Sequence, residues 1–132
     1  MFDQSTAVSP AIEPRTEPEE LAACRARIAE ERESGQFIAY DADDGFSVMR
    51  IPQGWSRIGR SASSDIRLDD PTVSRRHALL VRRPGGELSV LDDRSLNGVF
   101  VNGERTDWGE LADGDELTIG RYRLHIICAA TP

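Results

Sequence analysis

Two hydrophobic periods divide the chain near residue 36. Upstream of it, Leu21, Cys24 and Ile28 recur at spacings of three and four residues, which is the period of one face of an α-helix. Downstream of it, short runs rich in Val, Ile, Leu and aromatic residues alternate apolar with polar positions, as half-buried strands do. The pattern therefore predicts one helix followed by an all-β domain.

The predicted helix covers residues 16–35. Thr16 is the expected N-cap, with Pro18 in the first turn and Glu19 three residues after the cap, which is the arrangement of a capping box. Gly35 is the expected C-cap. Because the apolar stripe is thin, we expect this helix to remain solvated or to dock only loosely on the rest of the chain.

Strand-like runs continue from residue 36 to the end of the chain: QFIAYDA, GFSVMRI, WSRIG, IRL, HALLVRR, ELSVLDD, GVFV, DELTIG and YRLHII. Turn-forming stretches such as DADDG, PGG, VNG and ADGD separate them. About nine to eleven strands with no room for crossover helices predict an antiparallel β-sandwich over residues 36–132. Trp55 and Trp108 are expected to take part in sandwich and loop packing rather than to form a platform for a ligand. Residues 1–15, rich in Ser, Thr, Ala and Pro, predict a disordered leader.

Composition indicates one domain and a tail. The 132 residues are 39% hydrophobic and 30% charged, and no apolar run reaches the roughly 20 residues that span a bilayer. The first ten residues lack the cationic and apolar regions of a secretory signal. We therefore expect a cytoplasmic protein without a membrane partner. Cys24 and Cys128 are expected to be buried free thiols.

The net charge of −7 lies entirely in the first third of the chain. Residues 1–44 hold 11 acidic residues and 4 Arg, whereas residues 45–132 hold 12 of each. Seven of these Arg lie between residues 55 and 83, and the chain contains no Lys. Any bound anion would therefore meet guanidinium groups, which bind phosphate and carboxylate in a two-bond fork. The acidic chain lacks the long basic stripe of a nucleic-acid-binding protein.

Ser74 and His77 stand three residues apart at the start of an apolar run. A nucleophile and its base would need an orienting acid and an oxyanion hole, and no motif for these is present. A zinc site would need paired ligand spacing, which the two His (His77, His125) and two Cys do not show. Ser74, with Arg60 upstream, fits an anion-binding cluster of loops better, so no enzyme activity, metal or cofactor is expected.

Four short motifs follow one another between residues 59 and 103. They are Gly59-Arg60, Ser74-x-x-His77, Asn97-Gly98 and Asn102-Gly103. In this order and spacing they resemble the motifs of the forkhead-associated (FHA) domain, over about residues 45–127. The resemblance implies an eleven-stranded β-sandwich that binds phosphothreonine peptides through loops at one end. The resemblance also implies a role in signalling by Ser/Thr protein kinases, with a kinase or its substrate as the binding partner.

The resemblance implies a role for each matched residue. Arg60 and Ser74 would hold the phosphate, Arg75 would flank it, and Asn97 would hydrogen-bond the peptide backbone. A second set would fix the loops and turns, consisting of Gly59, His77, Gly98, Asn102 and Gly103.

One position departs from the family pattern. The family usually carries Thr or Ser directly before the Asn, whereas this chain has Leu96. Either Ser95 replaces the missing hydroxyl or the site has one polar contact fewer. Leu96 therefore leaves open an alternative function, a phosphate-independent scaffold of the same fold. A further predicted ligand is the chain's own tail, phosphorylated on Thr6 or on Thr16.

Overall fold

The computed structural model describes residues 19–31, 34–42 and 45–129. The helix α1 (Glu19–Glu30) precedes eleven strands. In chain order these are β1 (Gly35–Ala42), β2 (Gly45–Arg50), β3 (Gly54–Gly59), β4 (Ile66–Arg67), β5 (Ala78–Arg82), β6 (Leu88–Asp92), β7 (Val99–Val101), β8 (Glu104–Arg105), β9 (Trp108–Leu111), β10 (Glu116–Ile119) and β11 (Tyr122–Ala129).

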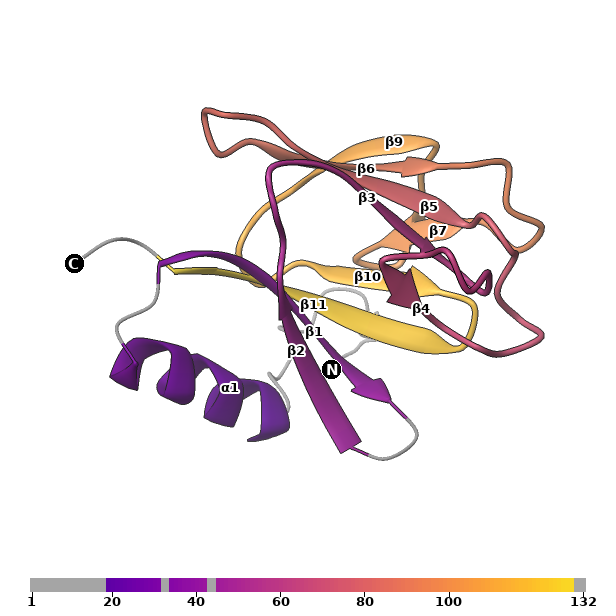
Figure 1. Ribbon diagram of the computed structural model, residues 1–132. Coiled ribbons are helices and arrows are strands. Elements are labelled where there is room, and N and C mark those ends of the chain that lie inside the picture. The colour runs from indigo at the N-terminus through magenta and orange to yellow at the C-terminus, as the bar shows by residue number, and fades with distance from the viewer. Residues whose placement is uncertain (1–18, 32–33, 43–44, 130–132) are drawn as a thin grey trace, which may run out of the picture.

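The strands form two sheets that face each other (Figure 1). The six-stranded sheet has the order β2-β1-β11-β10-β7-β8, and the five-stranded sheet has the order β4-β3-β5-β6-β9. The predicted all-β sandwich of about eleven strands is confirmed. It departs from a purely antiparallel arrangement at one place, since β4 pairs with β3 in parallel. The sequence pattern did not single out β8 or β9, because two and four residues carry too little periodicity.

The main core lies between the two sheets. Alternate residues of each strand point into it, as the pleat of a strand requires. On the five-stranded sheet these include Ile58, Leu80 and Val90, and on the six-stranded sheet Leu117 and Leu124. All five side chains have 0% of their surface exposed. This continuous apolar layer holds the loops at either end of the sandwich on a rigid frame.

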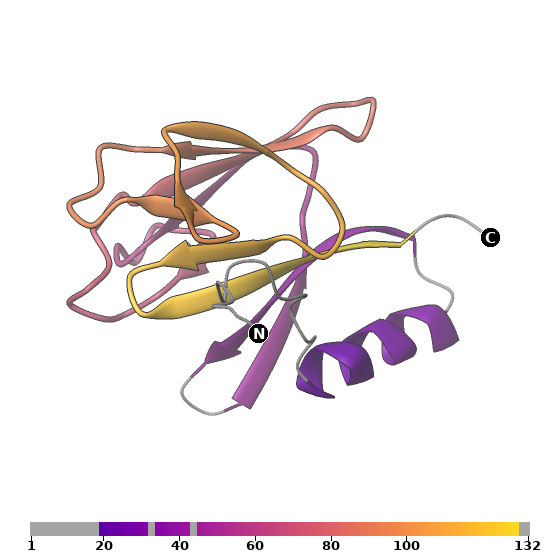
Figure 2. The ribbon, with the colours of Figure 1, turned by 180° about the vertical axis from the view of Figure 1, so that it is seen from behind.

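Helix α1 docks on the outer face of the six-stranded sheet, contrary to the expected loose helix (Figure 2). Leu21 and Ile28 are only 2% and 5% exposed. They pack against outward-facing residues of β1 and β11, including Phe37 and Ile127. The sequence pattern missed this because two deeply buried residues per helix look like a thin stripe, whereas the sheet beneath supplies most of the apolar surface.

The boundaries of the helix also differ from the prediction. It ends at Glu30, and Gly35 begins strand β1 instead of capping the helix. A φ of +130° at Gly35 explains the glycine, since other residues rarely adopt that conformation. The predicted N-cap Thr16 and the leader 1–15, with Thr6, lie outside the described residues.

Trp55 and Trp108 do not pack inside the sandwich, which corrects the sequence prediction. Their exposed fractions are 64% and 49%. Ile58 of β3 and Leu111 of β9 face the core, so the alternation of each strand turns the tryptophans outward. A strand pattern predicts two faces but does not say which face has a covering layer.

The two cysteines are free and half-buried. Burial raises the pKa of both thiols above the usual value, and nearby Asp113 adds to the effect at Cys128. The thiols therefore stay protonated at neutral pH. Within the described part of the chain, no helix is long and apolar enough to cross a membrane.

Candidate functional site

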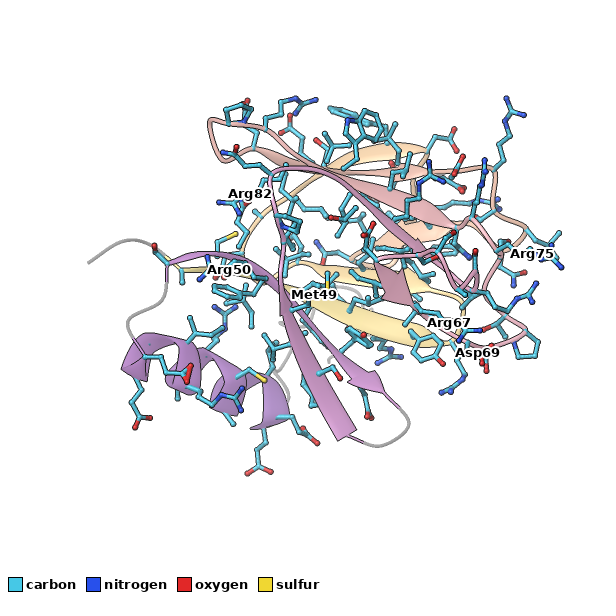
Figure 3. The ribbon with its side chains drawn as sticks, viewed as in Figure 1. Met49, Arg50, Arg67, Asp69, Arg75 and Arg82 are labelled. Carbon is cyan, nitrogen blue, oxygen red and sulfur yellow. The ribbon has the colours of Figure 1, made fainter. Side chains whose placement is uncertain are left out.

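Three of the four sequence motifs, Gly59-Arg60, Ser74-x-x-His77 and Asn97-Gly98, converge on the loops at one end of the sandwich. These loops join β3 to β4, β4 to β5 and β6 to β7. Figure 3 shows Arg75, Arg67 and Asp69 at this end, whereas Arg50 and Arg82 lie toward the opposite end. We call it the loop end. Strands β3, β5 and β6 are hydrogen-bonded neighbours, so three separate stretches of sequence meet there.

Arg60 is held by the segment that precedes β5. Its backbone N–H donates to the carbonyl oxygen of Ser74, and its Nε donates to that of Val73, both at 3.0 Å. Within the described residues, the two terminal nitrogens of its guanidinium group make no hydrogen bond. The side chain is thus fixed at Nε while its outer N–H groups remain available to an anion.

Gly59 is required by a close approach of two backbone segments. A Cβ at this position would lie 2.1 Å from the carbonyl oxygen of Arg75. That oxygen already accepts a hydrogen bond from the N–H of Ser61 at 3.2 Å. Because backbone atoms cannot move aside cheaply, only glycine lets the two loops lie this close.

Ser74 and His77 are hydrogen-bonded, but not as a nucleophile and its base. The backbone N–H of Ser74 donates to Nδ1 of His77 at 3.0 Å. Nδ1 is therefore unprotonated in the neutral ring, so Nε2 carries the proton and donates to the carbonyl oxygen of Gly98 at 2.8 Å. His77 is 0% exposed. The ring therefore joins two loops and is closed to solvent and to any substrate.

The hydroxyl of Ser74 lies beside the β6–β7 loop. Its Oγ accepts a hydrogen bond from the backbone N–H of Leu96 at 3.0 Å, which leaves the hydroxyl proton to donate elsewhere. Next in the loop, Nδ2 of Asn97 donates to the carbonyl oxygen of Thr72 at 2.8 Å. Arg60, Ser74 and Asn97, which lie far apart in sequence, are thus joined through shared backbone contacts. Arg75 is exposed at the same end of the molecule.

Ser95 takes part in the turn that leads to Asn97. Its backbone N–H donates to Asp92 Oδ1 at 2.8 Å, and its Oγ accepts from the N–H of Gly98 at 2.9 Å. Gly98 has a φ of +86°, and a Cβ there would lie 2.8 Å from Nε of Arg105. The hydroxyl of Ser95 is therefore engaged in shaping the loop, with its proton still able to donate.

Asn102 and Gly103 lie at the other end of β7, away from the loop end. Their φ values of +51° and +87° match the two positive values of a type I′ hairpin turn between β7 and β8. The side chain of Asn102 accepts from the N–H of Glu116 at 2.9 Å and donates to Asp115 at 3.0 Å. These two residues shape a turn and do not face the other motif residues.

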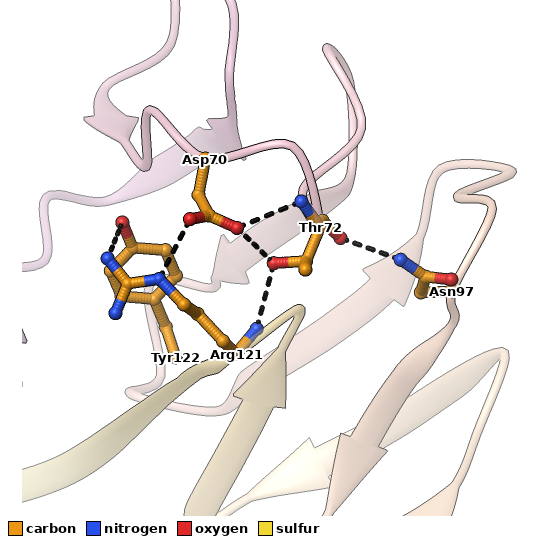
Figure 4. A network of polar contacts seen from close by, with 5 residues as sticks. All are labelled: Asp70, Thr72, Asn97, Arg121 and Tyr122. Carbon is orange, nitrogen blue, oxygen red and sulfur yellow. Dashed lines mark hydrogen bonds and ion pairs between the residues drawn. The ribbon is translucent and has the colours of Figure 1, made fainter.

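Sequence reasoning missed a bracket that holds the β4–β5 loop, made of Asp70, Thr72 and Arg121 (Figure 4). Thr72 Oγ1 donates to Asp70 Oδ2 at 2.5 Å and accepts from the backbone N–H of Arg121 at 3.0 Å. Arg121 Nε donates to Asp70 Oδ1 at 2.8 Å. The spacing Asp-x-Thr could have suggested the local turn. The contact with Arg121, some 50 residues away, follows only from the sandwich.

The bracket lowers the pKa of Asp70 from 3.8 to about 2. The hydrogen bond from the side chain of Thr72 contributes most to this lower pKa, followed by the bond from Arg121 and then the bond from the backbone N–H of Thr72. Gly120 permits the close approach, because a Cβ there would lie 2.5 Å from Thr72 Oγ1 and the residue has a φ of +58°. The turn between β10 and β11 is therefore coupled to the loop that carries Ser74.

Comparisons with known proteins agree with this geometry. The FHA domain model matches residues 56–120. The chain is 37% identical to the oxoglutarate dehydrogenase inhibitor of Corynebacterium diphtheriae, across 86% of this chain and 92% of that protein. This chain belongs to the FHA domain family. It is also 53% identical over 78 residues to the glycogen accumulation regulator GarA of Mycolicibacterium smegmatis, across 59% of this chain and 49% of GarA.

The fold comparison gives the same result. A solved FHA domain, from a structural and functional analysis of phosphothreonine-dependent FHA domain interactions, superposes with a TM-score of 0.68 and 27% identity. The superposition covers 74% of this chain and 99% of that one.

The chain spans about half the length of GarA. The names of these two relatives describe one as a regulator and the other as an inhibitor. The described residues contain no group of three or more potential metal ligands.

Proposed function

We propose that this chain binds phosphothreonine-containing segments of proteins in Ser/Thr kinase signalling. Arg60 and Ser74 bind the phosphate, Arg75 flanks it, and Asn97 binds the backbone of the ligand. Ser95 donates from the turn beside them. The protein acts in the cytoplasm by binding and has no catalytic activity of its own.

The observation that most strongly supports phosphate binding is the fixed orientation of the Arg60 guanidinium group. Its Nε is anchored on Val73, so the guanidinium group is oriented before any ligand arrives, and little side-chain entropy remains to be lost on binding. A phosphate accepts two hydrogen bonds from such a fork. The hydroxyl of Ser74 is the neighbouring donor, and its oxygen is positioned by the N–H of Leu96.

The partner we propose is a folded protein that carries phosphothreonine, either a Ser/Thr kinase or one of its substrates. The relative from Corynebacterium diphtheriae supports a folded partner, because its name gives an enzyme as its target. The 27% identical FHA domain supports phosphothreonine dependence. Residues 45–132 have no net charge, so local groups at the loop end, and not the overall charge, attract the phosphate.

A second function is favoured by Leu96, whose side chain is exposed beside Ser74 and has no group that could donate a hydrogen bond to a ligand. Under this alternative the chain is an interaction scaffold that recognises its partner without phosphate. Phosphorylated and unphosphorylated copies of one peptide separate the two functions, since the scaffold binds both equally.

The decisive experiment is calorimetric titration of Arg60→Ala with a phosphothreonine peptide library. We expect binding to fall at least about 100-fold, because the two hydrogen bonds of the fork to a charged group contribute about 1.5–3 kcal/mol each. The thermal transition should hardly move. Arg123→Ala, an exposed arginine of β11, serves as the control and should bind normally. Unchanged binding by Arg60→Ala would refute the proposed phosphate contact.

The chain's own tail is a further proposed ligand, through phosphorylated Thr6 or Thr16. Thr6 is the better candidate, because about ten residues of leader precede the predicted helix and can span on the order of 30 Å when extended. Amide shifts at Arg60 and Asn97 in kinase-treated protein, persisting on dilution and absent in Thr6→Ala, are expected. Shifts that fade on dilution would instead indicate binding to a second chain.

A further inference from the structure

The outer face of the five-stranded sheet carries an apolar stripe. It consists of Trp55 on β3, Leu79 and Val81 on β5, Leu91 on β6 and Trp108 on β9. We call these residues the outer stripe. The strand register joins them, since Trp55 pairs with Val81, Leu79 with Leu91, and Leu91 with Trp108. The stripe therefore crosses the sheet diagonally from β3 to β9.

The two outer faces of the sandwich differ in what covers them. Helix α1 covers part of the outer face of the six-stranded sheet, where Phe37 and Ile127 are 3% and 2% exposed. No helix lies over the outer stripe in the described part of the chain (Figures 1 and 2). Among the described residues, three large hydrophobic side chains are exposed, and Trp55 and Trp108 are two of them. Exposed apolar surface of this kind marks interaction sites.

The stripe continues into the loop end. Leu91 and Trp108 are paired directly before the β6–β7 loop, and the N–H of Asp92 donates to the carbonyl oxygen of Asp107 at 2.9 Å. At the opposite edge, Arg57 of β3 pairs with Leu79 and stands two residues before Gly59. A protein whose phosphothreonine occupies the loop end would therefore have its neighbouring surface over the outer stripe.

The exposed area of the outer stripe distinguishes a second copy of this chain from a partner protein that is also bound at the loop end. With about 250 Å² for a tryptophan side chain, the exposed fractions of Trp55 and Trp108 leave about 280 Å² in solvent. The other three residues of the stripe are half-buried and add less than the two tryptophans do. A stable interface between two copies of the chain needs about 800 Å² on each side. The stripe alone is too small for that, but it suits a contact that extends another one. Arg57 at one edge and Glu110 at the other provide the polar rim that such interfaces have.

We infer that the outer stripe is a second docking surface for the folded body of the phosphothreonine protein that occupies the loop end. This inference rests on the proposed function. The partner would present an apolar patch beside its phosphothreonine, flanked by an acidic group opposite Arg57. Trp55 and Trp108 are its central contacts, because large rigid aromatic rings supply most of the binding energy in such interfaces. A short peptide reaches only the loop end and does not contact the stripe.

The tryptophans allow a test without any substitution. The chain has two tryptophans, and both belong to the outer stripe, so 5-fluorotryptophan labelling gives two ¹⁹F resonances that report on this surface alone. The probes are an autophosphorylated Ser/Thr kinase catalytic domain, unlabelled, and a phosphothreonine peptide from its activation loop. We expect the kinase domain to shift both resonances and the peptide to shift neither.

Two variants complete the test. Trp55→Ser and Trp108→Ser should each weaken binding of the kinase domain tenfold or more, with peptide affinity unchanged within twofold. Arg123→Ser, on the other sheet, is the matched control and should change neither affinity. Circular dichroism and the melting temperature verify that each variant is folded.

The outcomes of these experiments distinguish a failure of the docking surface from a failure of the proposed function. Unmoved ¹⁹F resonances in the kinase complex, or equal affinity of wild type and variants for the kinase domain, would overturn the docking surface while leaving the proposed function intact. Resonances that shift with the concentration of the protein alone would assign the stripe to a second copy of the chain. If the wild-type protein bound neither probe, the proposed function itself would fail and the inference with it.

Discussion

The carbonyl oxygen of Thr72 accepts a hydrogen bond of 2.8 Å from Nδ2 of Asn97. Thr72 belongs to the loop before β5 and Asn97 to the loop after β6, so this bond ties together two walls of the loop end. Thr72 is itself fixed by Asp70 and by the N–H of Arg121. The orientation of the Asn97 amide is thus set by a turn on the other sheet, and its Oδ1 remains able to accept from a ligand.

Thr72→Val should weaken phosphopeptide binding although Thr72 touches no ligand. Valine keeps the shape of threonine but removes the Oγ1 hydrogen bonds to Asp70 and from the N–H of Arg121. The loop then keeps only the contact between Asp70 and the Arg121 side chain. We expect a loss of roughly threefold to tenfold in affinity, measured by calorimetry. Thr72→Ser keeps the hydroxyl and should bind nearly as wild type. Equal affinities of the valine variant and the wild type would show that the bracket does not position Asn97.

Asp70 should make stability sensitive to acid in a defined range. Its folded-state pKa is about 2, below the usual 3.8, so the folded form favours the ionised carboxylate. Its contribution is fully present above about pH 4 and is lost as the pH falls toward 2. Urea unfolding of the wild type and Asp70→Asn between pH 6 and pH 2 measures this. The stability difference between the two proteins should shrink as the pH falls, and a constant difference would contradict the assignment.

His77→Ala should act on stability before it acts on binding. The ring is fully buried and its two nitrogens pair with the N–H of Ser74 and the carbonyl oxygen of Gly98. Removing it leaves two buried polar groups unpaired beside a cavity, which costs about 3 kcal/mol. Denaturant unfolding provides the value, with Arg60→Ala as a control that should stay near wild-type stability. A variant with unchanged stability and lost binding would assign His77 to the ligand instead.

Leu96→Thr should tighten phosphopeptide binding. A hydroxyl at this exposed position would stand beside Asn97 and Ser74, and one added hydrogen bond to a phosphate corresponds to about tenfold or more in affinity. Leu96→Val is the matched control, because it has the shape of threonine without the donor. Fluorescence anisotropy with a labelled phosphopeptide measures both. If the threonine variant gained nothing over the valine variant, Ser95 would already fill the role or no donor would be needed there.

The sequence by itself determined the class of the fold and the set of motifs. Its period-two runs predict a sandwich because alternation of apolar and polar residues is a local consequence of the strand pleat. Gly59 and the Asn102-Gly103 turn were identifiable for a similar reason, since close approach and positive φ restrict the residue type at a single position. Recognition of the family came from four short motifs whose residues stand in a fixed order.

The tertiary structure alone decided which surfaces meet. Leu21 and Ile28 looked like a weak stripe until the sheet beneath α1 supplied the rest of the apolar contact. Trp55 and Trp108 were expected to pack in the sandwich and its loops, yet among the described residues both remain exposed. The hydrogen bonds from Arg121 to the β4–β5 loop join residues about 50 positions apart. A local pattern records the preference of each residue, whereas pairing across such distances depends on how the two sheets close on each other.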